Sequence, residues 1–562
     1  MSDVRVTIAT GTTWQEVAAD RQRHRDATIG ALQPPLPELA LKELPLNVTG
    51  LCQDTLSEQE LAITGANVED LAPKLASGEW SAASVTSAFL RRAGLAQKLV
   101  NCVTELLPKA ALKRAAELDE YLAAHGKPVG PLHGIPISVK EHLAMKGLDL
   151  NAGFVSWVGR VAEDDALILK ILWEAGAVFY VRSTQPQTLM HLETSSNLYG
   201  VTVNPSNTTL TAGGSSGGEG ALVGLRGSIL GIGTDIGGSI RSPAANNGVF
   251  GFKPTAGRLP VNGWSATMAG SEGILGTIGP LSTSLAGLEL FTKSVVAGKP
   301  WLTSPDLVAM DWKENYSPFE GRKLKIAVMW EDGVVMPHPP ITRALEGVVE
   351  KLKTSSVVDV VEWKPWRHDL AWEIIAGLYF CDGGADETAA INASGEPWRP
   401  LSKFILDENP HMKHYDIASL WAACAQRNEY REKYAALWNA TGDGGDMVDV
   451  ILCPVGPGVA PKLDTSRYWG YTSQWNLLDY PAVVFPANDR VSVEKDVGSL
   501  EYQPRGEKDV YNWNLWKEHG AEGYKDAPIS LQLVARRYED EKLLKALEIV
   551  LKQSGLPATV SQ

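Results

Sequence analysis

Apolar residues recur every three or four positions along several stretches of the chain, and these stretches alternate with short, continuous apolar runs. The first pattern is typical of amphipathic helices and the second of buried strands. The alternation predicts an α/β fold in which helices cover a sheet. The helical period covers 81–97, 108–125, 164–175, 341–354, a stretch that begins near 417, and 538–553, and the apolar runs are 177–182 and 448–453.

The N-terminal region, 1–60, is expected to form a helical extension that wraps the rest of the chain. Capping-box patterns that begin at Thr13 and Ser57 predict two helix starts, because each Ser/Thr and the Glu three residues later satisfy each other's free N–H groups. Between them, prolines in 32–38 disfavour a helix and predict an extended connector. We therefore predict that 61–562 is the domain that carries the chemistry.

The charge balance and the cysteines narrow the choice of partners and compartment. The 562 residues include 66 acidic and 52 basic side chains, a formal net charge of −14, which would repel nucleic acid and anionic lipid. The sequence offers no signal peptide and no stretch near the roughly 20 apolar residues of a membrane span. The five cysteines form no CxxC pair, which indicates a reducing compartment. We expect a cytoplasmic protein with no nucleic-acid or membrane partner.

Glycine and serine dominate the segment 212–255, and several kinds of site compete to explain it. A phosphate-binding loop requires a lysine directly after a glycine, but the first lysine, Lys253, follows a phenylalanine. A dinucleotide-binding loop requires G-x-G-x-x-G, and the glycines in 231–237 are spaced one residue too far apart. Ser215 matches the G-x-S-x-G elbow of α/β-hydrolases, but the residues before it are polar rather than a buried strand. A flexible linker would not need the apolar residues threaded through the segment.

Two motifs identify a better explanation. The stretch 237–243, Gly-Gly-Ser-Ile-Arg-Ser-Pro, and the upstream stretch 133–142, His-Gly-Ile-Pro-Ile-Ser-Val-Lys-Glu-His, resemble the signature and lysine motifs of the amidase signature family. The likeness extends from about 61 to 550, and 185–193 most resembles the fungal acetamidases and general amidases. The resemblance implies an amidase-signature fold, with a large twisted mixed β-sheet covered by α-helices.

The resemblance also implies a Ser-Ser-Lys catalytic triad. In this reading Ser239 is the nucleophile, Lys140 is the base, and Ser215 bridges them through a cis peptide bond with Gly214. An amide is a poor electrophile, so the reaction needs an activated nucleophile and a proton donor for the leaving nitrogen. Lysine has a reference pKa of about 10.4, so Lys140 must be desolvated to act as a base at neutral pH.

Further site residues follow from the same resemblance. Successive backbone N–H groups in the glycine turn are expected to stabilise the oxyanion of the tetrahedral intermediate. The expected oxyanion hole comprises Ile236, Gly237, Gly238 and Ser239; the supporting residues are Ser216, Asp235 and Arg241; and the substrate-binding residues are Met190 and Gly214.

The expected activity is therefore hydrolysis of a small-molecule carboxylic amide, aliphatic or aryl, through an acyl-enzyme, without a metal or another cofactor. Two other activities stay open: the amidase subunit of a tRNA-dependent amidotransferase, and a hydrolase of longer acyl amides or carbamates. A non-catalytic scaffold is disfavoured because the three triad residues are intact. The oligomeric state is not readable from the sequence, although the family resemblance favours a homodimer.

Overall fold

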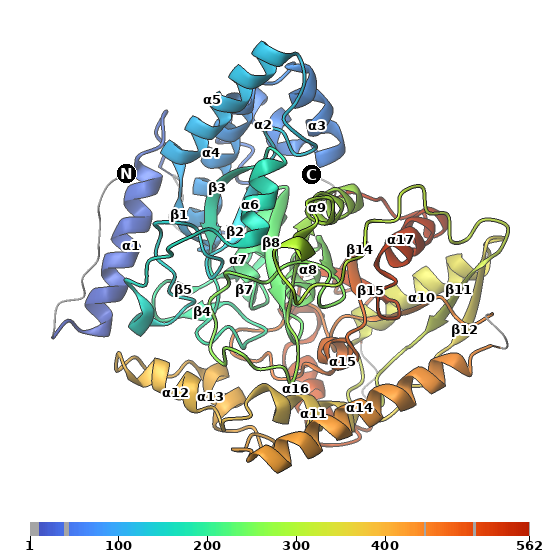
Figure 1. Ribbon diagram of the computed structural model, residues 1–562. Coiled ribbons are helices and arrows are strands. Elements are labelled where there is room, and N and C mark those ends of the chain that lie inside the picture. The colour runs from blue at the N-terminus through green and yellow to red at the C-terminus, as the bar shows by residue number, and fades with distance from the viewer. Residues whose placement is uncertain (1–10, 39–43, 443–445, 498–501, 561–562) are drawn as a thin grey trace.

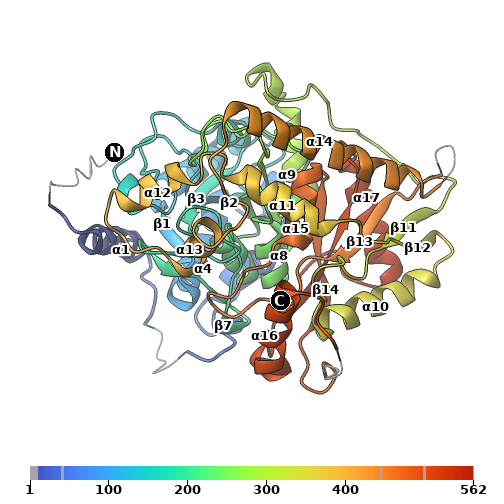
Figure 2. The same cartoon turned by 90° about the horizontal axis from the view of Figure 1, so that it is seen from below.

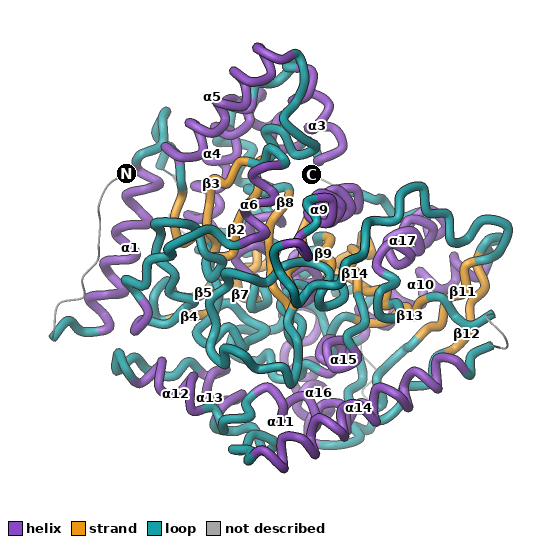
Figure 3. The backbone as a smooth tube through the Cα atoms, viewed as in Figure 1, coloured by secondary structure: helices purple, strands orange, loops and turns teal. Residues whose placement is uncertain are grey.

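The computed structural model describes residues 11–38, 44–442, 446–497 and 502–560, and an 11-stranded sheet runs through the centre of the molecule (Figure 1, Figure 3). In spatial order the strands are β1 (Val103–Leu106), β3 (Val178–Ser183), β2 (Pro136–Lys140), β8 (Leu230–Asp235), β10 (Thr277–Ser282), β9 (Phe250–Lys253), β14 (Ala482–Arg490), β15 (Pro528–Val534), β13 (Val450–Pro454), β11 (Leu324–Val328) and β12 (Val358–Glu362).

The sheet is mixed. Strand β2 pairs in parallel with both β3 and β8, and β11 pairs in parallel with both β12 and β13. The remaining neighbours in the sheet are antiparallel. The large mixed sheet that the resemblance implied is confirmed. Two short ribbons lie outside it: β4 (Ser195–Ser196) with β5 (Gly200–Val201), and β6 (Val203–Asn204) with β7 (Asn207–Thr211).

Helices surround the sheet and connect its strands. They are α1 (Trp14–Gly30), α2 (Glu58–Gly65), α3 (Val68–Ser77), α4 (Ala82–Val100), α5 (Pro108–His125), α6 (Leu167–Glu174), α7 (Gly217–Gly224), α8 (Arg241–Asn247), α9 (Leu285–Ala297), α10 (Pro339–Lys353), α11 (His368–Tyr379), α12 (Ala385–Asn392), α13 (Pro400–Leu406), α14 (Ile417–Asn439), α15 (Gly470–Leu478), α16 (Glu507–Gly523) and α17 (Asp540–Ser554).

The helices that the apolar period and the capping boxes predicted are present, and their boundaries differ where the backbone departs from helical geometry. Both predicted capping boxes are present, at the starts of α1 and α2. The predicted helix over 108–125 matches α5. The one predicted over 538–553 begins later, at Asp540, because Tyr538 has a left-handed backbone with φ 64°. The predicted strand over 177–182 lies one residue further along the chain, as β3.

Residues on the two faces of β11 enter different hydrophobic cores. Side chains alternate along a strand, so Ile326 and Val328 pack with α10 and α17, whereas Ala327 faces the opposite core. That opposite core is rich in aromatic residues from α11, α14 and α15. Figure 2 shows α10 and α14 on opposite sides of this end of the sheet. The sheet is thus buried on both faces, as its continuous apolar runs predicted.

The N-terminal helix lies against the edge of the sheet that β1 forms. The Gln22 amide donates to the Leu198 carbonyl over 2.8 Å, and His24 Nε2 lies 3.1 Å from a carboxylate oxygen of Glu105 in β1. Residues 1–10 and 39–43 of the predicted extension lie outside the described residues. The division at residue 60 stays a prediction. Within the described ranges, none of the helices combines the length and apolar character needed to cross a membrane.

Candidate active site

Two neighbouring parallel strands end at the same edge of the sheet and place the first residues of the site. Lys140 is the last residue of β2, and Thr234 and Asp235 are the last two of β8. The Lys140 side chain is fully buried, with 0% of its surface exposed. Its Nζ lies 2.6 Å from Ser215 Oγ and 3.0 Å from Thr234 Oγ1. The structure therefore joins Lys140 and Ser215, two of the predicted triad residues.

The environment of Lys140 favours a neutral amine. Burial lowers the pKa of Lys140 to about 7, against the opposing effect of the negative charges of Asp235 and Glu219. Glu219 lies in α7 and accepts hydrogen bonds from the hydroxyls of Ser138 and Ser183. At neutral pH a large fraction of Lys140 thus carries a free lone pair, which is the form a general base requires.

A short chain of hydrogen bonds determines which group donates and which accepts between Lys140 and Thr234. His142 Nδ1 lies 2.9 Å from the Ser265 carbonyl oxygen, which can only accept, so this nitrogen carries the proton. Burial, and then the charge of Lys140, lower the pKa of His142 well below its usual value, so the ring is neutral and Nε2 accepts. The Thr234 hydroxyl, 3.1 Å from Nε2, donates to it. Thr234 therefore accepts from Lys140.

The turn before α7 brings Ser215 to Lys140. The peptide bond between Gly214 and Ser215 is cis, as the resemblance implied. A Cβ atom on Gly214 would lie 2.4 Å from the carbonyl oxygen of Glu193, so only glycine fits there. Gly214 thus packs against the backbone of Glu193, and its substrate-binding role stays a prediction. Ser216 is buried, and its N–H donates to the Ser239 carbonyl over 3.1 Å, which ties the two serine turns together.

Ser239 lies in the loop between β8 and α8. Its side chain is 6% exposed and forms no hydrogen bond with any residue that the structure describes. The link from Lys140 to Ser215 is therefore made, whereas the link from Ser215 to Ser239 is not. Catalytic hydrogen bonds of this kind often close only when substrate is bound.

The backbone of 236–239 departs from the prediction at one residue. The Gly238 N–H donates to Asp235 Oδ1 over 2.9 Å, so it is not free for an oxyanion, and the predicted set of four donors is too large. The physical reason is the carboxylate of Asp235, which lies beneath the loop and binds this N–H. For the N–H groups of Ile236, Gly237 and Ser239, the described residues provide no acceptor.

Two carbonyl contacts fix the direction of the unbonded donors. The Tyr379 hydroxyl donates to the Ile236 carbonyl over 2.8 Å, and the Ser242 N–H donates to the Gly238 carbonyl over 2.7 Å. In a trans peptide the carbonyl and the N–H point in opposite directions. The N–H groups of Gly237 and Ser239 are thus turned away from these partners, which leaves them available to a substrate oxygen.

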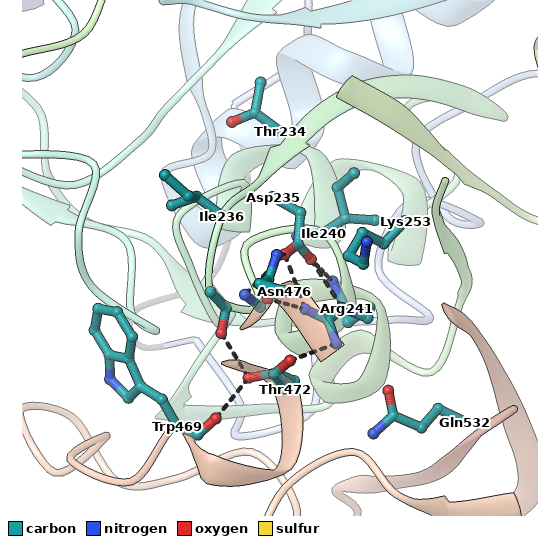
Figure 4. A network of polar contacts seen from close by, with 12 residues as sticks. Thr234, Asp235, Ile236, Ile240, Arg241, Lys253, Trp469, Thr472, Asn476 and Gln532 are labelled. Atoms are coloured by element: carbon teal, nitrogen blue, oxygen red, sulfur yellow. Dashed lines mark hydrogen bonds and ion pairs between the residues drawn. The ribbon is translucent and has the colours of Figure 1, made fainter. Parts of the chain in front are cut away.

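A buried ion pair between Asp235 and Arg241 braces this loop (Figure 4). Asp235 and Arg241 have fully buried side chains and meet through two contacts, of 2.9 and 3.0 Å. Asn476 in α15 donates to Asp235 over 2.9 Å and accepts from Arg241 over 2.6 Å. Burial alone would raise the pKa of Asp235, but Arg241 outweighs it, with help from Lys253 and Asn476, and holds the pKa at about 2. The predicted supporting residues Asp235 and Arg241 therefore act as one unit.

Replacing Arg241 with methionine should lower the free energy of unfolding by about 3–5 kcal/mol, because the variant leaves the Asp235 charge buried without its partner. Denaturation in urea would measure the loss. Arg367, whose ion pair with Asp369 is exposed, offers a matched control, and Arg367→Met should change stability by about 1 kcal/mol or less. A loss for Arg241→Met no larger than that of the control would contradict this account of the loop.

Aromatic and aliphatic side chains form the wall next to the glycine turn. Met190, a predicted substrate-binding residue, is 5% exposed and belongs to the same core as Trp469 and Tyr379. A Cβ atom on Gly237 would lie 3.2 Å from the Trp469 ring, so this ring borders the loop directly. A cavity of about 70 Å³ adjoins the other side of the turn, with Leu192, Ser242 and Thr472 in its wall. Contact between Met190 and substrate stays a prediction.

The sequence did not reveal several residues that position the site. Tyr379, Thr472, Asn476 and Trp469 lie more than a hundred positions from the motifs that they support. Thr472 donates from Oγ1 to the Gly237 carbonyl over 2.7 Å, and its own carbonyl accepts from Arg241. No short motif around these residues signals such a role. All four lie within 61–550, where the chain resembles the family, and only Asn476 lies in a short stretch, 476–481, that is similar to a family motif.

Comparisons with known proteins identify the family. The model of the family described as "Amidase" matches residues 84–544. An acetamidase of Emericella nidulans is 40% identical over 96% of this chain and 98% of its own length, and an acetamidase of Aspergillus oryzae is 38% identical over 96% and 99%. A solved structure named fatty acid amide hydrolase superposes with a TM-score of 0.90 and 36% identity, over 97% of this chain and 96% of that one. The chain therefore belongs to the amidase signature family and is a hydrolase that acts on amides.

Proposed function

We propose that the protein hydrolyses small aliphatic or aryl carboxylic amides to the acid and ammonia or an amine, with Ser239, Ser215 and Lys140 as its catalytic triad. One observation supports this proposal most strongly. A fully buried lysine with a pKa of about 7 lies 2.6 Å from Ser215, in the turn that is tied to Ser239.

Acylation begins when Ser239 Oγ attacks the carbonyl carbon of the amide. The Ser239 proton passes to Ser215 Oγ as the Ser215 proton passes to the neutral Lys140 amine. The oxygen that becomes negative accepts hydrogen bonds from the N–H groups of Gly237 and Ser239, with Ile236 as a third donor. The C–N bond then breaks, and the proton returns through Ser215 to the leaving nitrogen. Ammonia or an amine departs, and the acyl group stays on Ser239 as an ester.

Deacylation repeats these steps with water in place of Ser239. The water oxygen attacks the ester carbon while its proton passes through Ser215 to Lys140. The same backbone N–H groups hold the oxyanion of the second tetrahedral intermediate. The proton then returns to Ser239 Oγ as the bond between that oxygen and the acyl carbon breaks. The acid leaves, and the three side chains regain their starting protonation states.

The wall of the site favours a short acyl group. The Trp469 ring borders Gly237, and Tyr379 and Trp372 pack around that ring, so bulky aromatic side chains fill the space beside the expected oxyanion. The two acetamidases among the relatives carry names that agree with a short substrate. The structural neighbour named fatty acid amide hydrolase supports longer acyl amides as a second candidate.

Ammonia release from a panel of amides tests this substrate class. The panel contains acetamide, hexanamide, benzamide, glutamine and a long-chain fatty acyl amide. We expect the highest kcat/KM on the short aliphatic amides or benzamide. Preference for the fatty acyl amide would support the second candidate, and release from glutamine alone would support the amidotransferase alternative.

Replacing Gly237 with alanine should lower kcat by about 10²-fold, the loss expected when one oxyanion donor is displaced. The new Cβ would lie 2.7 Å from the Tyr379 hydroxyl and would displace the group that holds the Ile236 carbonyl. Steady-state kinetics with acetamide would measure the change. Gly347→Ala in α10 is the matched control, because no atom lies within 4 Å of its added Cβ and activity should not change. Equal activity in both variants would argue against an oxyanion role for this turn.

A further inference from the structure

A second cavity, of about 530 Å³, lies between the N-terminal segment and the C-terminal part of the chain, and none of the proposed catalytic residues lines it. Arginines from three separate elements face it: Arg92 from α4, Arg226 from the turn after α7, and Arg490 from the end of β14. We call it the arginine cavity. Polar residues such as Thr49, Gln53 and Thr559, and apolar residues such as Pro528 and Ile529, complete its wall.

The two inner arginines are buried but have only neutral partners. Arg92 is 7% exposed and donates to the Leu225 carbonyl over 2.8 Å and to the Thr64 hydroxyl over 2.7 Å. Arg226 is 5% exposed and donates to the carbonyls of Gly65 and Val560. No ion pair joins either of them to a carboxylate among the described residues.

Among the described residues, the charges around the arginine cavity are therefore unbalanced. Burial, and then the like charge of Arg92, lower the pKa of Arg226 to about 10, so the side chain is still a cation at neutral pH. Cys52 does not compensate Arg92, because burial raises the pKa of its thiol. Glu69 acts on Arg226 only at a distance, and its carboxylate accepts from Ser284 instead. Buried cations without a counter-ion are strongly destabilising, which indicates that an anion fits here.

Arg490 and Asp489, the other two charged residues that line the cavity, also favour binding of an anion. Arg490 is exposed and donates through Nη1 to the Ser206 hydroxyl and the Asp526 carbonyl, so its other guanidinium N–H groups are not used by these contacts. Asp489 also lines the cavity, but its carboxylate is bound by Arg343. The walls thus hold three guanidinium groups against one carboxylate that already has a cationic partner.

The backbone at Arg226 supports a role for its side chain. Its φ of 54° lies in the left-handed region, where glycine is the least strained residue, and the next residue is Gly227. A bulky side chain in such a conformation is maintained only when the surrounding contacts stabilise it. Here the carbonyls of Gly65 and Val560 hold the Arg226 guanidinium, and Val560 also lines the cavity.

We propose that the arginine cavity binds a small oxyanion with two negative charges, of the phosphate monoester or dicarboxylate class. Planar guanidinium groups match both carboxylate and phosphate oxygens through paired hydrogen bonds. Three arginines around one ligand favour a dianion over a monovalent ion, because a second negative charge on the ligand is attracted by all three guanidinium groups. The cavity is separate from the proposed triad, so this proposal does not depend on the catalytic mechanism.

Isothermal titration calorimetry with inorganic phosphate, and in a separate arm with succinate, tests the proposal on the full chain, with potassium chloride at equal ionic strength as the reference. We expect saturable binding of at least one dianion, with acetate at least tenfold weaker. Arg226→Gln and Arg490→Gln should each weaken binding by about tenfold or more, the loss expected for a hydrogen bond to a charged group. Arg367→Gln, a change of an exposed arginine outside the cavity, should leave the Kd unchanged.

Arg226 is buried and Arg490 is exposed, so replacing Arg226 is more disruptive to the fold than replacing Arg490. Arg490 is exposed, so Arg490→Gln should fold even if Arg226→Gln does not, and circular dichroism would check both. Preference for phosphate over succinate would identify a phosphate ester as the ligand class, and the reverse would identify a dicarboxylate. The proposal is overturned if neither anion binds beyond the chloride reference, or if folded Arg490→Gln binds as tightly as the unchanged protein.

Discussion

Replacing Ser239 with alanine is expected to lower kcat on a short amide by about 10⁴-fold or more, because loss of the nucleophile in serine hydrolases has effects of this size. The hydroxyl is the only group of the proposed triad that bonds to the substrate carbon. Its side chain is 6% exposed and forms no hydrogen bond with a described residue, so its removal should leave the packing intact. Ammonia release under saturating acetamide, together with a thermal melt, would measure both effects.

A second buried serine provides the control for this experiment. Ser294 in α9 is 5% exposed, and its hydroxyl has no hydrogen-bond partner in the described part of the chain. Ser294→Ala therefore removes the same hydroxyl oxygen from a similarly buried position, outside the motif at 237–243. Its kcat should be unchanged. Activity of Ser239→Ala within tenfold of that control would rule out Ser239 as the nucleophile.

Replacing Lys140 with alanine is expected to lower kcat/KM by about 10³-fold, within the range that general acid–base catalysis contributes. The unchanged enzyme should also show a characteristic pH profile. The neutral amine is the active form, and the pKa of Lys140 lies near 7, so kcat/KM should fall about tenfold per pH unit below 7 and level off above it. Initial rates from pH 5 to 9 would give both results.

The pH profile separates a base from a merely structural lysine. In Lys140→Ala the residual activity should lose this acidic limb, since the titrating amine is gone. Lys170→Ala, a change at an exposed lysine paired with Asp164, should keep the profile of the unchanged protein. An acidic limb that persists in Lys140→Ala at the same midpoint would assign the titration to another group.

The sequence predicted helix boundaries correctly where residues close in the sequence determine them. Helix α5 begins at Pro108 and ends at His125, where the apolar period, the first-turn proline and the following glycine had placed it. The capping boxes at Thr13 and Ser57 are likewise made within one turn. Such features involve residues at most four positions apart, so the sequence alone contains the information.

Only those site residues that lie in a family sequence motif could be predicted from the sequence. Lys140 and Ser215 are 75 positions apart, and the resemblance to a known family, rather than any physical rule, paired them. The bond between Gly238 and Asp235 and the contribution of Tyr379 were missed, because they depend on the direction of a peptide plane and on a helix that folds over the loop from another part of the chain. Arg226 and Arg490, 264 positions apart, face one cavity only because separate segments of the fold meet there, among them 49–61 and 557–560.

Labelling with a fluorophosphonate, followed by peptide mass spectrometry, tests the central claim most directly. This reagent bonds covalently to an activated serine in place of an acyl group. The account predicts a single modified serine, Ser239, with labelling lost in Ser239→Ala and strongly slowed in Lys140→Ala. An amidase-active preparation that is modified at another serine, or at none, would contradict the proposed triad.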